Sequence, residues 1–244
     1  MNKVHSLVAI AIVGVLAFVG CSLPGGDAGK GAFDYVILAK SAVSNVPTSS
    51  VTGNIGLSPA ATSFVTGFSL VNATGYATSA QVKGSIFAAD MAPPTNTNLT
   101  AAVTNMIAMY TAAAGLATSG GDLNLGGGTI SGNTLAPGVY TWTTALNITG
   151  NITLSGSSFA TWTFQVQGNL TTAAGVHIIL AGGAQAKNIT WQVSGATSTG
   201  SNSVFKGIIL DQTAITLGVG STLNGRALAQ TAVNLSGTNT VTGP

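Results

Sequence analysis

Stretches in which apolar and small polar residues alternate cover most of this chain. Between residues 122 and 244 they follow one another closely, and Gly, Ser or Asn stands between them. An alternation with a period of two predicts half-buried β-strands. We read three short strands in each repeat, and repeats of this kind stack into a parallel β-helix, or β-solenoid, of triangular section. Residues 51–57 and 81–87 alternate in the same way and predict further strands.

One segment has a helical pattern instead. After Pro93-Pro94, apolar side chains recur three, four and seven positions apart between residues 97 and 115, which places them on one face of an α-helix. Thr97 or Asn98 is the expected N-cap, and Gly115 the expected left-handed residue at the end. We expect this uncharged helix to lie along the solenoid with its apolar stripe buried.

A four-residue motif recurs in the C-terminal half. It is Thr-Ala-Leu-Asn at 144–147, Thr-Ala-Ile-Thr at 213–216 and Thr-Ala-Val-Asn at 231–234, and residues 194–197 (Ser-Gly-Ala-Thr) are a near copy. Stacked strands lie about 4.8 Å apart, so the copies predict regular files of small side chains on one surface.

The alternation within each copy predicts which side chains face outward. The aliphatic third residue of each full copy must point inward, so its two neighbours point outward and the leading threonine sits at a corner. Thr171, in a coil that lacks the motif, falls in the same file. The candidate surface residues are Thr144, Ala145, Asn147, Thr171, Gly195, Thr197, Thr213, Ala214, Thr216, Thr231, Ala232 and Asn234.

The N-terminal residues predict export. A short segment with Lys3 precedes an apolar run at 7–19, and the sequence Val19-Gly20-Cys21 follows, as in a bacterial lipoprotein signal. We interpret residues 1–20 as the signal peptide, Cys21 as the lipidation site, 21–32 as a flexible tether and 33–244 as one domain. The protein is then an outer-membrane or cell-surface lipoprotein, or else a secreted protein.

Charge is scarce, which excludes several functions. Only 5% of the residues are charged and glutamate is absent. The seven Lys and Arg residues are scattered, whereas nucleic-acid binding needs many on one face. The five aspartates are isolated in sequence; Asp211 and Arg226 lie about one coil apart, and we interpret them as a structural ion pair. His177 is expected at a coil corner. The sequence therefore predicts no catalytic site, cofactor or metal.

The three tryptophans, Trp142, Trp162 and Trp191, allow two interpretations. We expect them to fill wide places in the core or to cover an edge; the alternative is that their aromatic faces bind sugar.

At this point the residues match a family. The segments 37–41 (Ile-Leu-Ala-Lys-Ser), 46–49 (Val-Pro-Thr-Ser), 53–59 (Gly-Asn-Ile-Gly-Leu-Ser-Pro) and 224–229 (Asn-Gly-Arg-Ala-Leu-Ala), the inserted helix and the Thr-Ala/Gly-x-Thr/Asn motif resemble the microbial ice-binding proteins. The resemblance covers about residues 33–244.

This resemblance implies both a fold and a function. The fold is a right-handed solenoid whose N-terminal strands complete a coil beside the C-terminal ones, with the helix packed along one face. The function is adsorption to ice through the motif-bearing face, by a protein that we expect to be monomeric. A surface-anchored adhesin or glycan-binding solenoid is the alternative.

Overall fold

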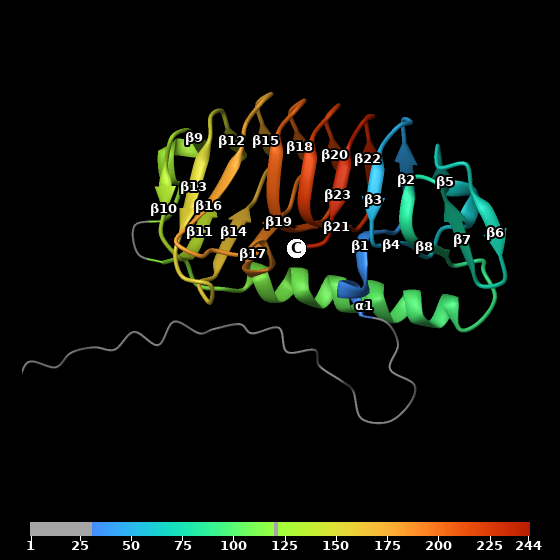
Figure 1. Cartoon of the computed structure of the whole chain (residues 1–244). Helices are drawn as coiled ribbons and strands as arrows, with labels where there is room; N and C mark the ends of the chain where they lie inside the picture. The colour runs from blue at the N-terminus through green and yellow to red at the C-terminus, as the bar shows by residue number, and fades with distance from the viewer. Residues whose placement is uncertain (1–30, 120–121) are drawn as a thin grey trace, which may run out of the picture.

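Parallel strands stacked side by side make up most of the molecule, and one long helix runs beneath them (Figure 1). The structure is a computed structural model that describes residues 31–119 and 122–244. The predicted signal peptide, Cys21 and residues 22–30 of the predicted tether lie outside the described residues. Ala32 opens the short 3-10 helix η1 (Ala32–Asp34) and is fully buried.

The described strands form three sheets. The first sheet, which we call sheet I, contains β11 (Gly138–Trp142), β14 (Trp162–Val166), β17 (Ile189–Val193), β19 (Val204–Asp211), β21 (Thr222–Ala229), β23 (Thr240–Thr242), β3 (Ser50–Thr52), β8 (Val82–Ala88), β4 (Asn54–Leu57) and β1 (Tyr35–Ala39), with the hairpin of β6 (Val71–Ala73) and β7 (Tyr76–Ser79) at one end. Sheet II, in spatial order, contains β5 (Val65–Thr66), β2 (Ala42–Asn45), β22 (Ala232–Leu235), β20 (Ile215–Leu217), β18 (Thr197–Thr199), β15 (Leu170–Thr172), β12 (Leu146–Ile148) and β9 (Thr129–Ile130). Sheet III contains β10 (Thr134–Leu135), β13 (Ile152–Ser155) and β16 (Ile178–Ala181).

From β9 to β17 the chain visits the three sheets in rotation, and from β17 to β23 it alternates between sheets I and II. It passes from β14 in sheet I to β15 in sheet II and β16 in sheet III, and then returns to sheet I as β17. β14 and β17 pair in parallel, with Phe164 opposite Trp191. One such circuit is a coil. The predicted parallel stacking of short strands is therefore confirmed, and the molecule is mainly β with one α-helix.

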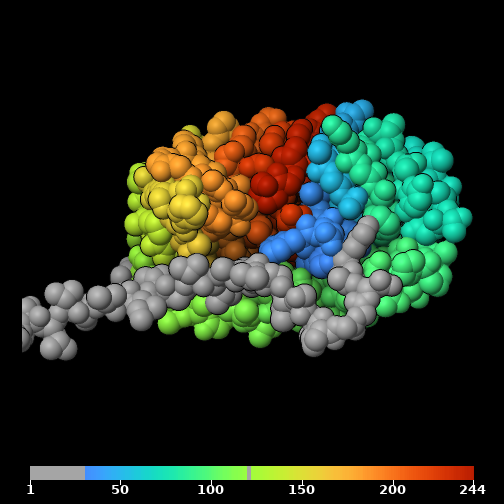
Figure 2. Space-filling model, turned by 60° about the horizontal axis from the view of Figure 1, so that its bottom comes forward, coloured from blue at the N-terminus to red at the C-terminus, as the bar shows by residue number. Residues whose placement is uncertain are grey.

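The first three and the last three described strands meet in the middle of the molecule (Figure 1). β1 pairs with β21, β2 with β22 and β3 with β23, all in parallel. Figure 2 shows the consequence, since the red C-terminal coils lie directly against the blue N-terminal segment. This is the arrangement that the family resemblance predicts, and alternation alone does not reveal it.

The core is a continuous column of apolar side chains inside the coils. Trp142, Trp162 and Trp191 are each 0% exposed, so the prediction that they fill the core is confirmed. The rings of Phe164 and Trp191 stack with their centroids 4.0 Å apart. The indole N–H of Trp191 donates to the Lys206 carbonyl at 3.0 Å, which satisfies its buried polar atom.

Helix α1 (Thr95–Ala114) begins two residues before the predicted start. The predicted caps are wrong. Pro94 holds the N-cap position without a side-chain hydrogen bond, and Gly115 is right-handed with φ −85°. A left-handed turn is unnecessary because Gln165 Nε2 donates to the carbonyl of Ala113, in the last turn, and to that of Leu116, just beyond the helix, each at 2.8 Å.

One face of the helix is buried against sheet I, as predicted. Leu99, Val103 and Met106 pack there with Leu210 and Leu228. Near the other end, Tyr110 shares a 3.0 Å hydrogen bond with Ser194. None of the helices in the described segments has the length and apolar character required to cross a membrane.

Candidate functional site

The outer surface of sheet II carries one uninterrupted file of small polar side chains. Each strand contributes the residue that lies between its two inward-facing neighbours, and the strand pairing puts these residues side by side. All of them are exposed or half-exposed. From one end of the sheet to the other, this central file is Thr66, Ser44, Asn234, Thr216, Ser198, Thr171, Asn147 and Thr129.

A second outward file lies beside the first, two residues earlier in each strand. Ala42 and Ala232 are directly paired in it. By the same register, the positions that precede β20, β18, β15 and β12 continue the file, and all are exposed or half-exposed. This alanine file is Ala42, Ala232, Ala214, Ala196, Asn169 and Ala145. Neither file contains a charged side chain.

Hydrogen bonds between neighbouring strands hold parts of the central file. Ser44 Oγ donates to Asn234 Oδ1 at 2.8 Å, and Thr171 Oγ1 donates to Asn147 Oδ1 at 2.6 Å. Such bonds restrict the rotamers of these side chains, so the surface is pre-organised before anything binds to it.

The leading threonines lie at the corner where sheet I passes into sheet II. Thr144 is exposed, and Thr213 and Thr231 are half-buried. Thr213 Oγ1 donates to the Gly195 carbonyl at 2.7 Å, so this hydroxyl bonds the backbone of the neighbouring coil. Gly195 thus belongs to the corner.

The prediction that Thr197 faces outward is wrong. It is 1% exposed, and its hydroxyl donates to Asp211 Oδ2 at 2.6 Å inside the molecule. The near copy at 194–197 is shifted by one residue relative to the full copies, because Thr197 pairs with Ile215 and Ser198 pairs with Thr216. Ser198, exposed in the central file, takes the place that had been assigned to Thr197.

Sequence reasoning missed several other members of the two files. Ser44, Thr66 and Thr129 belong to the central file, and Ala42 belongs to the alanine file. The sequence does contain a pattern that points to Ala42 and Ser44. Residues 41–44 (Ser-Ala-Val-Ser) repeat the pattern of 231–234 (Thr-Ala-Val-Asn), with serine in place of threonine and asparagine.

Asp211 and Arg226 do not form the predicted pair. In the pairing of β19 with β21, Asp211 lies opposite Ala229 and Arg226 lies opposite Ile208. Arg226 instead donates to the Tyr35 carbonyl at 2.7 Å, and its guanidinium lies 5.3 Å from the centre of the Phe33 ring. Arg226 comes three positions before Ala229, the partner of Asp211. Because an odd number of positions along a strand reverses the direction of a side chain, Arg226 points outward while Asp211 points inward.

Asp211 is the buried carboxylate beside sheet II, at 1% exposure. Its Oδ1 accepts the Thr213 N–H at 2.7 Å, and its Oδ2 accepts the Thr197 hydroxyl. Burial raises the pKa of this carboxyl to about 6, although the hydrogen bonds from Thr197 and Thr213 act to lower it.

The described residues contain no group of three or more side chains of the kinds that hold a metal ion. His177, exposed, lies just before β16, where it forms an isolated bridge with Val204. Gly126, Gly127 and Gly128 all have positive φ, between 63° and 88°, and form a turn before β9.

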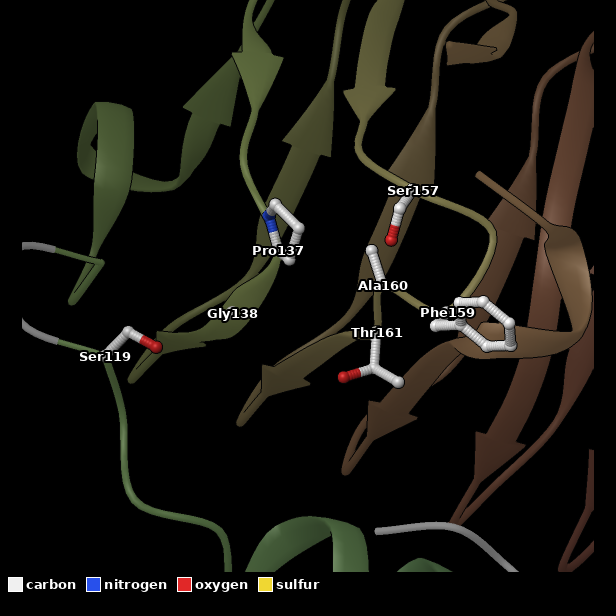
Figure 3. Close-up of a pocket in the computed structure, with 7 residues that line it drawn as sticks. All are labelled: Ser119, Pro137, Gly138, Ser157, Phe159, Ala160 and Thr161. Carbon is white, nitrogen blue, oxygen red and sulfur yellow. The ribbon is translucent and has the colours of Figure 1, made fainter. Parts of the chain in front are cut away.

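A hollow of about 350 Å³ lies away from sheet II, beside β11 and β14 (Figure 3). Phe159 stands at its rim and is 87% exposed. The lining residues are Ser119, Pro137, Gly138, Ser157, Phe159, Ala160 and Thr161.

The chain is similar to a protein family and to individual proteins that are all described as ice-binding. Residues 37–242 match the model of the family described as ice-binding-like. An ice-binding protein of Typhula ishikariensis is 46% identical over 86% of this chain and 85% of its own. One from Flavobacterium frigoris is 46% identical over 76% of this chain and 65% of its own.

Solved structures have the same fold. An ice-binding protein with antifreeze activity from an Arctic yeast aligns with a TM-score of 0.85 at 45% identity, over 87% of this chain and 92% of that chain. An ice-binding protein domain from Shewanella frigidimarina aligns with a TM-score of 0.79 at 25% identity, over 86% of this chain and 94% of that one.

Proposed function

Because the chain belongs to the ice-binding-like family, we propose that it adsorbs to ice crystals through the outer face of sheet II and so inhibits ice growth and recrystallisation. The observation that carries this proposal is the pair of parallel, charge-free files on sheet II. The central file runs without a break across all of its strands, including those from the N-terminal part of the chain.

The chemistry of the two files suits a surface made of water. Alanine and threonine methyl groups order the water around them, and the hydroxyl and amide groups of the central file hydrogen-bond to that ordered layer. Strands about 4.8 Å apart give the array a regular repeat. Charged side chains would hold water in a different arrangement, and the files have none.

Many weak contacts on one rigid surface act together. Once a few side chains engage the ice, the rest are at high effective concentration, so release of the whole protein becomes rare. Ice must then grow as curved fronts between adsorbed molecules. This lowers the temperature of growth and leaves the melting temperature unchanged.

The same proposal includes the finer form of the scaffold. We take the coils to form a right-handed β-solenoid of triangular section, and the rotation of the chain through three sheets between β9 and β17 supports this form. The protein then acts as a monomer and without catalysis, since adsorption needs only the face.

We also propose that Cys21 is lipidated and anchors the protein to a membrane, in the outer membrane or at the cell surface. The support is the sequence alone, in which an apolar run ends at Val19-Gly20-Cys21 and this is the only cysteine. Attached acyl chains stabilise membrane binding by about 0.8 kcal/mol for each buried methylene. Such an anchor would hold a cell to ice.

The function is tested by observing single ice crystals in a solution of the purified mature protein. A gap between the melting and growth temperatures, with faceted crystals, is the expected result. Round crystals that grow freely at high protein concentration would show that the scaffold serves another ligand.

Glycan binding is the second candidate, and one observation favours it. The exposed ring of Phe159 beside the hydroxyls of Ser157 and Thr161 offers a stacking surface next to hydrogen-bonding groups, as a neutral sugar requires (Figure 3). A glycan array with Phe159→Ala as the control tests it. Binding that this substitution abolishes would establish a sugar site separate from sheet II.

A further inference from the structure

Two polar side chains interrupt the apolar core at adjoining positions. In sheet II the inward file that contains Thr197 is otherwise aliphatic, and Leu170 and Ile215 are its neighbours. In sheet I the inward file that contains Asp211 is otherwise apolar, and Val193 and Ala229 are its neighbours. Both polar residues are 1% exposed, and they hydrogen-bond to each other across the corner.

Asp211 also changes the backbone hydrogen bonding of that corner. In neighbouring coils the corner N–H donates to the equivalent carbonyl of the adjacent coil: Gly168 to Thr144, Gly195 to Gly168, and Thr231 to Thr213. Thr213 departs from this series. Its N–H donates to Asp211 Oδ1 at 2.7 Å, and its hydroxyl takes over the bond to the Gly195 carbonyl.

These bonds set two features of the proposed ice-binding face. Thr197 is turned inward, which leaves Ala196 and Ser198 as the outward residues of that coil. Thr213 is held at the entrance to β20, directly before Ala214 and Thr216. Asp211 itself is inside and cannot touch ice.

We infer that Asp211 is a positioning residue for the sheet II face, which fixes the corner at Thr213 and the orientation of β18 through its carboxylate. This assignment rests on the function proposed above. The carboxylate form positions these groups best, because an ionised oxygen is a stronger acceptor for the Thr213 N–H and the Thr197 hydroxyl than a neutral one. After protonation one carboxyl oxygen becomes a donor, and the Thr197 hydroxyl must turn to accept from it.

Among the described residues, no other titratable group faces Asp211. The residues in register with it, Val193 and Ala229, are apolar, and the facing residues Thr197 and Ile215 carry no charge. Its raised pKa arises from burial and not from a neighbouring charge.

The test is a pH series of thermal hysteresis on the full mature protein and on Asp211→Asn. For the unsubstituted protein we expect hysteresis about twofold greater at pH ~7.5 than at pH ~4, since many other contacts remain. Its unfolding temperature should move in the opposite direction, because ionisation of a buried carboxyl destabilises the fold. A purely structural role would make activity follow stability. Asp211→Asn should show a flat activity profile, and Asp90→Asn, which changes an exposed carboxylate, should keep the original one.

A second variant separates positioning from folding. Asp211→Ala combined with Thr197→Val restores apolar files like those of the neighbouring coils, so it should fold with undiminished stability and lower hysteresis. Unchanged hysteresis in that variant, or the same pH profile with and without the Asp211 carboxylate, would overturn the assignment and leave ice binding intact. Absence of hysteresis at every pH would instead overturn the proposed function and this inference together.

Discussion

Ser44 and Asn234 are 190 residues apart in the sequence and share a 2.8 Å hydrogen bond on the outer surface of sheet II. The bond joins β2, near the start of the described chain, to β22, near its end. It makes one surface out of two parts of the sequence. A face assembled only from the C-terminal repeats would end at Asn234, whereas this one continues through Ser44 to Thr66.

The corrected register of β18 predicts that substitutions at two adjacent residues have different effects, one on activity and the other on stability. Ser198→Tyr places a ring on the face, so thermal hysteresis should fall and the unfolding temperature should stay the same. Thr197→Val removes the buried partner of Asp211 Oδ2 and should lower the free energy of unfolding by about 1–3 kcal/mol. Calorimetry and hysteresis on both variants check this. An unchanged free energy of unfolding in Thr197→Val would contradict the buried hydrogen bond to Asp211.

Burial of Asp211 predicts that stability depends on pH. Because the folded-state pKa is about 6 against an ordinary value of 3.8, the unfolded chain releases its proton first as pH rises. The contribution of Asp211 to the free energy of unfolding should therefore fall by at most about 3 kcal/mol between pH ~4 and ~6 and be constant outside that window. Urea unfolding at several pH values measures this. Asp211→Asn should remove the fall; a fall of the same size in that variant would assign it to another group.

The stacked aromatic column predicts a stability effect far from the face. Trp191 is 0% exposed, stacks on Phe164 and donates a hydrogen bond to Lys206. Trp191→Ala should lower the free energy of unfolding by about 3–5 kcal/mol, through the lost burial and the cavity left behind. At a temperature where the variant is still folded, its hysteresis should match that of the parent protein. Stability unchanged by the substitution would contradict the packing described.

The lipid anchor predicts a change of location with one substitution. Cys21→Ser removes the thiol that acylation needs, so the protein should move from the membrane fraction to the soluble fraction of its host. Fractionation followed by immunoblotting measures this. An equal membrane fraction with and without Cys21 would mean that the chain is held there by something else.

Much of the fold could be predicted because strand alternation is a local property. The inward residues Ile215 and Val233 and the outward residues Thr216 and Asn234 follow directly from it. The pairing of β2 with β22 is not local, and it came only from resemblance to a family.

Thr197 shows where alternation fails. From the sequence, a threonine that faces a buried aspartate cannot be distinguished from one that faces solvent, because both have small residues as neighbours. The helix caps failed for a related reason. The bonds that Gln165 makes to the helix end come from 49 to 52 residues away, and a pattern within the helix does not contain them.

The central claim is that sheet II is the surface that meets ice, and Thr216→Tyr tests it most directly. Thr216 is in the middle of the central file. The ring of a tyrosine at this position would break the flat surface without entering the core. Thr222→Tyr is the matched control, because Thr222 is half-exposed at the start of β21, outside sheet II. The measurement is thermal hysteresis of the two variants, with circular dichroism spectra that match the parent protein. The account predicts that Thr216→Tyr loses most of the activity and Thr222→Tyr keeps it. Full activity in Thr216→Tyr, or loss in Thr222→Tyr alone, would contradict it and move the ice-binding surface to another face.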